Sequence, residues 1–420
     1  MSNALAKELR VMWAELAADT NISCTISKLV TQQNRFDMGD QEGERSDDTA
    51  YIPKPYRFNV QEGYESSDSD FQDLIDRMIV VTRNGVKRVL FKTEAFQNRD
   101  GRITEQGKNA LKRDLRNAID LSVYQELMLH ASQVNTSDSA FTFQDAIEME
   151  NRMYNAGLGG YSKNALLSNT DYKEVAGVLG ANQYDASRTT NALERAMLPD
   201  LATFTTMRSD YTLKLAGVAT PAGMAVDGDQ TYIVSTYNTP GDKNSGFKNP
   251  NQQVLKLKAT ATVNVSGLKG SKISRDGGFA LDPETREETD DLMTHTIVAV
   301  DNVNKTVTIE PPIIGKDGGS PYANCSTDAK DDDAVSIVNA KTSNPSLFWI
   351  PEAITIVPGN IMTPDEGMSV AQATSEQGLP MELISEGDFH KGGRKFKGVV
   401  YFDVVATNPE YIFAHLSNQA

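Results

Sequence analysis

The sequence predicts a mixed α+β fold with a β-rich domain inserted into its second half. Three observations favour this class: a long helical apolar pattern at residues 104–131, a change to strand patterning near residue 212, and a mixed pattern that resumes after residue 347. The chain has 420 residues, of which 39% are hydrophobic. This length can bury a large core and predicts roughly two to three domains.

The charge balance and the apolar runs exclude several protein classes. The chain carries 41 basic and 57 acidic side chains, so its net charge is −16, which argues against a protein that wraps nucleic acid. No apolar run approaches the ~18 residues of a membrane span, and the first residues form a charged amphipathic stretch without a secretory signal. We therefore expect a cytoplasmic product without a membrane anchor. Cys24 and Cys325 are expected to be free thiols.

The first hundred residues predict one helix and an extended polar segment. Apolar residues of 3–18, among them Leu9 and Trp13, form one helical stripe. This helix could dock on its own subunit or on a partner, and the sequence favours neither. Residues 78–92 are rich in β-formers around an Asn-Gly turn signal, which predicts an extended hairpin that lies on another surface.

The middle of the chain predicts helices. Five apolar residues at i+4 spacing, from Leu111 to Leu127, predict a long helix over residues 104–131. A second helix is expected from Thr142, whose hydroxyl can form a capping box with Asp145, to Asn155. Shorter helices are expected at 171–179, ended by Gly180, and at 189–198.

Residues 212–345 read as strands separated by Pro, Gly, Asn and Asp, which is typical of a small β-barrel or sandwich. Strands are expected at 231–236, 253–265, 296–300 and 306–309, the last two joined by the turn 301–305. Further strands are expected at 353–357, 368–374 and 398–406, before an apolar tail at 411–413.

The sequence contains no recognisable catalytic or metal-binding pattern. The four histidines, His130, His295, His390 and His415, are not spaced as metal ligands, and structural roles are expected for them. Residues 241–248 have the outer spacing of a phosphate-binding loop, but Phe247 stands where lysine is required. We expect no catalytic residues, cofactor or metal.

The basic cluster at 390–397, which includes Arg394 and Lys395, differs from the acidic background. A flexible exposed loop and a charged interface contact explain this cluster about equally well.

Four stretches in the second half carry a family resemblance. They are residues 259–273 (ATATVNVSGLKGSKI), 298–312, 322–335 and 344–357. In order and spacing they resemble the major capsid protein of short-tailed enterobacterial phages, a coat family with an inserted domain on a Hong Kong 97-type fold. The resemblance extends over most of the chain and is weakest in the N-terminal third.

The resemblance implies a division of the chain into segments. These are an N-terminal arm (1–40), an extended loop over a neighbouring subunit (41–100), the spine helix with the peripheral domain (101–156), a peripheral and axial part (157–216), an inserted six-stranded antiparallel β-barrel (217–346), and the axial domain with the C-terminus (347–420). In the family, residues matching 282–289 are apolar, so we expect the packing between the inserted and core domains to differ here.

The resemblance also implies an assembly. Hexamers and pentamers would form an icosahedral T=7 procapsid around a scaffolding protein, which then expands as double-stranded DNA is packaged through a portal. The DNA would be enclosed without specific binding, and the virion would be assembled in the host cytoplasm.

Specific inter-subunit contacts follow from the same resemblance. The family's long loop at a two-fold axis matches residues 237–251, and a two-fold contact needs a self-complementary surface. We therefore expect Asp242 to pair with Lys243 or Lys248 of the symmetry-related copy. Other contacts are expected from Leu9 and Trp13 of the N-terminal helix, where the scaffolding protein could bind, and from Arg394 and Lys395.

Two other classes remain as alternatives. The Asn- and Thr-rich middle is compatible with a secreted or surface β-rich binding module, although no signal sequence is visible. An enzyme with a mixed core and a β lid would need a convergent polar pocket, and the scarcity of histidines makes it a poor reading.

Overall fold

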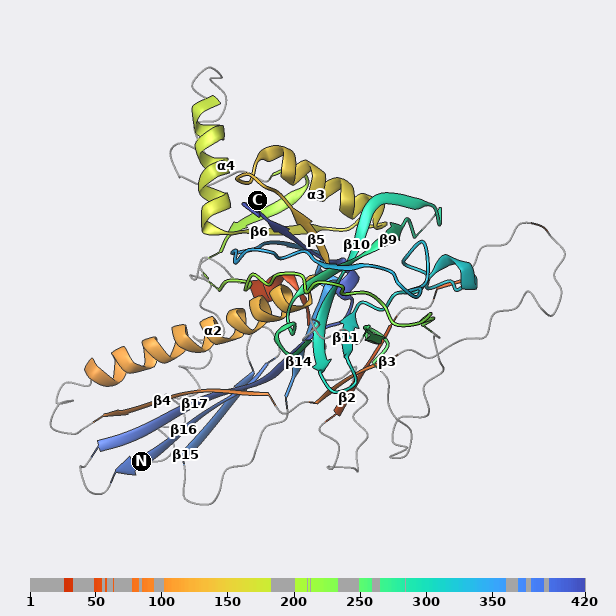
Figure 1. Cartoon of the computed structure of the whole chain (residues 1–420). Helices are drawn as coiled ribbons and strands as arrows, with labels where there is room; N and C mark the ends of the chain where they lie inside the picture. Colours follow the sequence, from red (N-terminus) through yellow and green to blue (C-terminus); the bar gives the residue numbers. More distant parts are fainter. Residues whose placement is uncertain are drawn as a thin grey trace. The chain divides into compact units, whose positions relative to one another are not determined.

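The chain is described from a computed structural model and divides into two compact units (Figure 1). Unit 1 comprises residues 1–52, 80–126 and 354–405, and unit 2 comprises 53–79, 127–353 and 406–420. The structure describes residues 26–32, 49–54, 57–58, 63, 78–82, 85–93, 102–182, 201–209, 211, 213–232, 249–258, 265–283, 285–359, 369–374, 379–388 and 393–419.

Unit 1 contains a six-stranded sheet and most of the longest helix. Its strands are β1 (Thr31–Gln32), β4 (Val86–Thr93), β14 (Ile354–Pro358), β15 (Ser369–Thr374), β16 (Pro380–Asp388) and β17 (Gly393–Ala406). The order is β1-β14-β17-β16-β15, and β4 also pairs with β17. The strands predicted at 353–357, 368–374 and 398–406 are therefore confirmed.

Helix α2 (Arg102–His130) confirms the helix predicted at 104–131 and lies along the sheet strands of unit 1 (Figure 1). Its residues Leu111, Leu115, Ile119 and Val123 are at most 4% exposed. The helix approaches β17 so closely that a Cβ on Gly398 would lie 2.7 Å from Leu111 Cδ1. Glycine at this position therefore permits the packing of helix on sheet.

The hairpin predicted at 78–92 is wrong, although both of its strands exist. Strand β3 (Met78–Thr82) pairs with β2 (Thr49–Pro53), whereas β4 pairs with β17 over eight residues. Gly85, in the expected turn, is held by Asp403, because its N–H donates to Asp403 Oδ2 at 2.7 Å. Stacking of Phe91 on Phe396, with centroids 4.7 Å apart, adds to this long-range pairing, which overrides the local turn signal.

Unit 2 contains two five-stranded sheets, of which the first is flanked by helices. Its strands are β5 (Gln133–Thr136), β6 (Lys163–Leu167), β7 (Phe204–Arg208), β13 (Ser346–Trp349) and β18 (Ile412–Leu416). They follow the order β5-β18-β13-β6-β7. Every residue of β6, β13 and β18 is buried, so the apolar tail predicted at 411–413 leads into the core of this sheet.

Two helices accompany this sheet. Helix α3 (Phe143–Asn155) begins with the predicted capping box between Thr142 and Asp145, which is confirmed. Helix α4 (Asn169–Asn182) confirms the helix predicted at 171–179, but Gly180 does not end it. The helices predicted at 3–18 and 189–198 lie outside the described residues.

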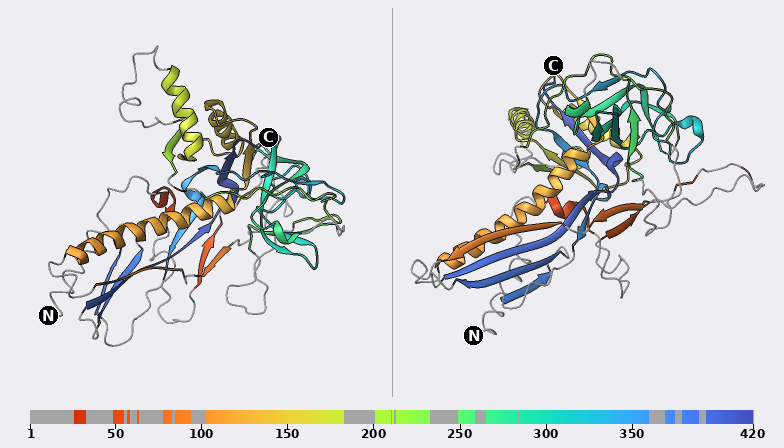
Figure 2. Two further views of the ribbon diagram at one scale, coloured as in Figure 1. Left: turned by 60° about the vertical axis from the view of Figure 1, so that its left-hand side comes forward. Right: turned by 60° about the horizontal axis from the view of Figure 1, so that its bottom comes forward.

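The second sheet of unit 2 forms the β-rich insertion (Figure 2). Its strands are β8 (Gln253–Lys256), β9 (Lys272–Leu281), β10 (Glu288–Asp301), β11 (Thr306–Glu310) and β12 (Val335–Ile337). The order is β12-β9-β10-β11-β8, and all four pairings are antiparallel. Its core includes Leu255, Ile297, Val307 and Ile309, which are at most 1% exposed.

The hairpin predicted at 296–309 is confirmed, since β10 and β11 pair around the turn that follows Asp301. The Asp301 carboxylate accepts hydrogen bonds from the N–H groups of Val303 and Asn304, which fixes this turn. The strand predicted at 253–265 is too long, because β8 ends at Lys256 and residues 265–267 form a 3-10 helix. No strand is present at 231–232, and 233–236 lie outside the described residues.

Ala225 and Val226 form isolated β-bridges near the two edges of this sheet. Val226 forms an isolated bridge with Leu257, which follows β8 at one edge, and Ala225 forms one with Ala334, which precedes β12 at the other. The short 3-10 helices are η1 (Ile26–Leu29), η4 (Val265–Gly267), η5 (Lys316–Gly318), η6 (Pro351–Ala353) and η7 (Pro409–Tyr411).

Candidate assembly site

Most of the residues predicted to contact other subunits lie outside the described part of the chain. These residues are Leu9, Trp13, Asp242, Lys243 and Lys248. Arg394 and Lys395 are described, and both belong to β17. Residues 393–397 therefore form a strand, so the flexible-loop interpretation of the basic cluster is wrong for them; 390–392 lie outside the described ranges.

Lys395 lies on an exposed basic face of the β4–β17 ladder. It pairs in register with Lys92 of β4 and with Glu386 of β16, and all three side chains are exposed. Leu90, two residues along β4, is 62% exposed on the same face. Arg394 and Lys395 as inter-subunit contact residues stay predictions.

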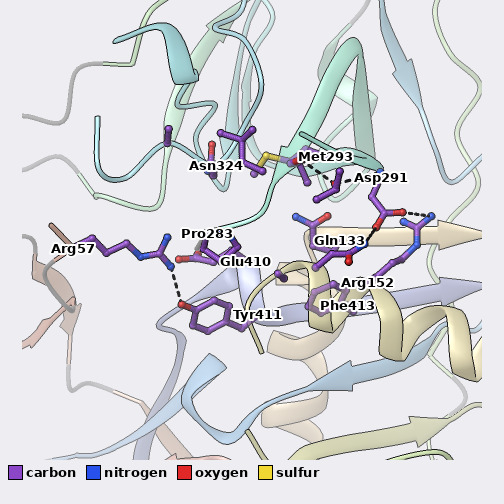
Figure 3. A pocket seen from close by; sticks show the side chains of 16 residues that line it. Arg57, Gln133, Arg152, Pro283, Asp291, Met293, Asn324, Glu410, Tyr411 and Phe413 are labelled. Carbon is purple, nitrogen blue, oxygen red and sulfur yellow. Dashed lines mark hydrogen bonds and ion pairs between the residues drawn. The ribbon is translucent and has the colours of Figure 1, made fainter. Parts of the chain in front are cut away.

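A buried polar junction joins three distant segments of unit 2. We define the root junction as Lys54, Arg57, Asn251, Glu410 and Tyr411. The side chain of Lys54 is 4% exposed, and its ammonium donates to Asn251 Oδ1 and to Glu410 Oε1, the latter at 3.4 Å. Arg57 Nη2 donates to Tyr411 Oη at 3.0 Å (Figure 3).

Asn251 extends this junction to the backbone at the end of β17. Its Nδ2 donates to the carbonyl oxygens of Ala406 at 3.2 Å and Thr407 at 3.1 Å. Burial raises the pKa of the Tyr411 hydroxyl, and the Arg57 guanidinium partly opposes this effect. The hydroxyl is therefore protonated near neutral pH.

Two small clefts border the root junction, with volumes of about 60 and 50 Å³. Both clefts are thus smaller than the roughly 300–1,000 Å³ that is typical of sites for small molecules. The larger cleft is lined by residues of α3, the inserted sheet and the C-terminal segment, among them Arg152, Asp291, Met293 and Phe413 (Figure 3).

The inserted sheet contacts α3 across this cleft. Arg152 Nη2 lies 3.2 Å from Asp291 Oδ1, and both side chains are less than 20% exposed. Asn155 Nδ2 adds a contact of 3.4 Å to Asp291 Oδ2, and the ring of Pro283 packs against Gly157. An ion pair on α3 and a proline beside the turn after α3 therefore join the inserted domain to this part of unit 2.

The inserted sheet also caps the end of α2. Lys272 is 1% exposed, and its Nζ donates to the Leu129 carbonyl at 2.6 Å and to Thr296 Oγ1 at 2.7 Å. Thr296 Oγ1 in turn donates to the Ala131 carbonyl at 3.1 Å. Because the last carbonyls of a helix have no intrahelical partner, these side chains satisfy groups that would otherwise be buried and unbonded. Burial lowers the pKa of Lys272 to about 7, although Glu310 opposes the shift.

The described histidines have structural surroundings. His130 Nδ1 lies 2.8 Å from Glu310 Oε2, and His295 Nδ1 lies 2.8 Å from the Pro311 carbonyl. Burial lowers the pKa of His295 to about 4, and burial also lowers the pKa of His415. In the described ranges, Cys325 is buried and no three His, Cys, Asp or Glu side chains gather as metal ligands. His390 lies outside these ranges.

No pattern in the sequence identifies the root junction or the cap on α2. Lys54 stands between two prolines in a polar stretch, and Lys272 precedes a strand-like run. Their partners lie between 24 and 356 positions away. A weak signal is available for Lys272, since a lysine next to a buried strand must have partners.

None of the helices within the described ranges could cross a bilayer.

Comparison with known proteins places the chain among phage coat proteins. The family model described as "P22 coat protein - gene protein 5" matches residues 4–417. No curated protein sequence matches significantly.

The chain is also similar to chains of solved phage structures. A chain in the capsid structure of cyanophage P-SCSP1u is 9% identical, with coverage of 96% of this chain and 92% of that chain and a TM-score of 0.45. A chain in the structure of Mycobacterium phage Che8 is 8% identical, with coverage of 94% of this chain and 91% of that chain and a TM-score of 0.43. The CUS-3 coat protein I-domain is 24% identical over 29% of this chain and 98% of that domain, with a TM-score of 0.21.

The family match spans nearly the whole chain and includes both compact units. The chain therefore belongs to the P22 coat protein family.

Proposed function

We propose that this chain, a major capsid protein of a tailed bacteriophage, assembles with a scaffolding protein into a T=7 procapsid that expands as DNA is packaged through a portal. The observation that carries the function is the family match over residues 4–417. The chain is a structural protein and not an enzyme, and its copies form a shell that encloses the genome. The binding-module and enzyme alternatives are set aside by this family membership.

The segment assignment in the shell is part of the proposal. We assign residues 1–40 to the arm, 41–100 to the extended loop, 101–156 and 157–216 to the spine, peripheral and axial parts, 217–346 to the inserted domain, and 347–420 to the axial domain. The scaffolding protein would bind weakly at the predicted N-terminal helix or at the inner surface of the shell, and assembly would take place in the host cytoplasm.

We further propose that the inserted domain is a six-stranded barrel. The support is the segment around Val226, which has hydrogen bonds towards both edges of the five-stranded sheet. Val226 N–H donates to the Asp333 carbonyl and Lys258 N–H donates to the Ala225 carbonyl, at 3.0 and 2.9 Å. A sixth strand here would close the sheet and remove its edges.

At the two-fold axes, Asp242 would pair with Lys243 or Lys248 of the symmetry-related copy. A loop that carries both charges is self-complementary, as an isologous contact requires. A shell in which residues 237–251 contact no other subunit would exclude this pairing.

Sedimentation velocity tests the assembly directly. The purified chain is mixed with the scaffolding protein of its phage, and megadalton particles of one size are expected, with aberrant or mixed particles in its absence. Small species under both conditions would contradict the proposed function.

A further inference from the structure

The root junction lies at the base of two segments that the proposed function assigns to inter-subunit contacts. Lys54 directly precedes residues 55–77, the part of the extended loop between β2 and β3. Asn251 is the last residue of 237–251, the predicted two-fold loop. The Lys54 ammonium and the Asn251 side chain are hydrogen-bonded to each other.

We propose that the root junction couples the extended loop to the two-fold loop, so that Lys54 and Asn251 are positioning residues for both inter-subunit contacts. The partner of each loop is a second copy of this chain. The inference rests on the proposed function for the identity of the loops, but the coupling itself is a property of the single chain.

The chemistry of the junction makes it cooperative. The Lys54 ammonium is buried and needs oxygen partners, which Asn251 and Glu410 supply. The Asn251 amide oxygen accepts from Lys54 while its nitrogen donates to two backbone carbonyls of residues 406–407. Removing the ammonium leaves a buried oxygen of Asn251 without its donor, so the disturbance reaches both segments.

A second contact holds the chain close to Lys54. Three residues after Lys54, Arg57 donates to the Tyr411 hydroxyl, which follows Glu410 in η7. Lys54 and Arg57 therefore give this end of the segment two side-chain anchors three residues apart. Phe58, the next residue, is 62% exposed and is available to a neighbouring copy.

Hydrogen exchange of the unassembled chain tests the coupling. Lys54→Met removes the ammonium and keeps an unbranched side chain that is shorter by one atom. Lys316→Met, at an exposed position in η5, is the matched control. We expect amide exchange to become about tenfold faster in residues 55–77 and also in 237–251, because both lose one anchor. The control is expected to leave both segments unchanged.

Acceleration confined to residues 55–77, or none in either segment, would overturn the coupling. If Lys54→Met does not fold, Tyr411→Phe is the variant that tests the coupling. It removes only the hydroxyl that accepts from Arg57 and creates no cavity. It should accelerate exchange in 55–77 and, through Glu410 and Lys54, more weakly in 237–251; an unchanged 237–251 segment would then refute the proposal.

Assembly gives the second readout. With scaffolding protein, Lys54→Met is expected to yield about tenfold fewer closed shells than the wild type at equal concentration, because misdirected loops weaken every repeated contact. Wild-type yield from the variant would also refute the inference, while absence of shells from the wild type itself would refute the proposed function and leave the exchange result standing.

Discussion

Buried ionisable side chains lie where the inserted sheet meets the rest of unit 2. Lys272 caps α2, His295 binds the Pro311 carbonyl, and Lys54 joins Asn251 to Glu410. Each sits among partners that supply hydrogen bonds, which is the condition for burying such groups. The protonation of Lys272 and His295, whose pKa values are lowered by burial, therefore links the stability of this region to pH.

His295 should make the chain sensitive to mild acid. Its pKa is about 4 in the folded chain and about 6.5 when exposed, so between these values the unfolded chain binds a proton that the folded chain does not. Stability therefore falls as pH drops from 6.5 to 4, by about 3 kcal/mol in total from this residue. Urea unfolding of the wild type and of His295→Gln at pH 6.5 and 4.5 measures it, and the same pH dependence in both would contradict this account.

Lys272 should make the stability of the chain depend on pH in the alkaline range. Its pKa of about 7 in the folded chain lies below the ordinary value of 10.5 for a lysine, so from pH 7 upwards the folded chain loses a proton that the unfolded chain keeps. Stability therefore rises with pH, by about 2 kcal/mol between pH 7 and 9. Lys272→Met should abolish this rise and, by leaving the Leu129 carbonyl without its donor, cost about 1–3 kcal/mol.

Unfolding of the wild type and Lys272→Met in urea at both pH values checks the prediction, with the exposed Lys316→Met as the control. An identical rise with pH in the wild type and in Lys272→Met would exclude Lys272 as its source.

At the scale of elements, local patterns predicted the helices better than the strand pairing. The i+4 apolar stripe of α2 and the capping box of α3 are encoded within a few turns, and both are confirmed. The partner of β4 lies about 300 residues away on β17, and a turn signal within residues 83–85 cannot encode such a pairing. Lys54 and Asn251 are 197 positions apart, so no local pattern in the sequence predicts their contact.

The capping box gives an element-scale prediction. Thr142→Ala removes the hydroxyl that accepts from Asp145 N–H at the start of α3. The free energy of unfolding should fall by about 1 kcal/mol, a value typical of a lost N-cap. Thr170→Ala, an exposed position within α4, is the control and is expected not to lower stability. Equal effects of the two substitutions in thermal unfolding would contradict the assigned role of Thr142.

At the scale of the whole molecule, the net charge of −16 and the lack of a catalytic pattern indicated a container more than a binder or an enzyme. The family resemblance, and not composition, gave the coat function, and the family match confirms it. The contact residues could not be tested in the same way, because a subunit interface depends on surfaces of several copies. Repetition of weak contacts over a closed shell then supplies stability that no single pair provides.

Cryo-electron microscopy of particles made by co-expressing the chain with the scaffolding protein of its phage tests the central claim most directly. The account predicts closed icosahedral T=7 shells in which residues 237–251 meet their symmetry-related copies at two-fold axes. The absence of particles, or small species both with and without scaffolding protein, would contradict the proposed assembly.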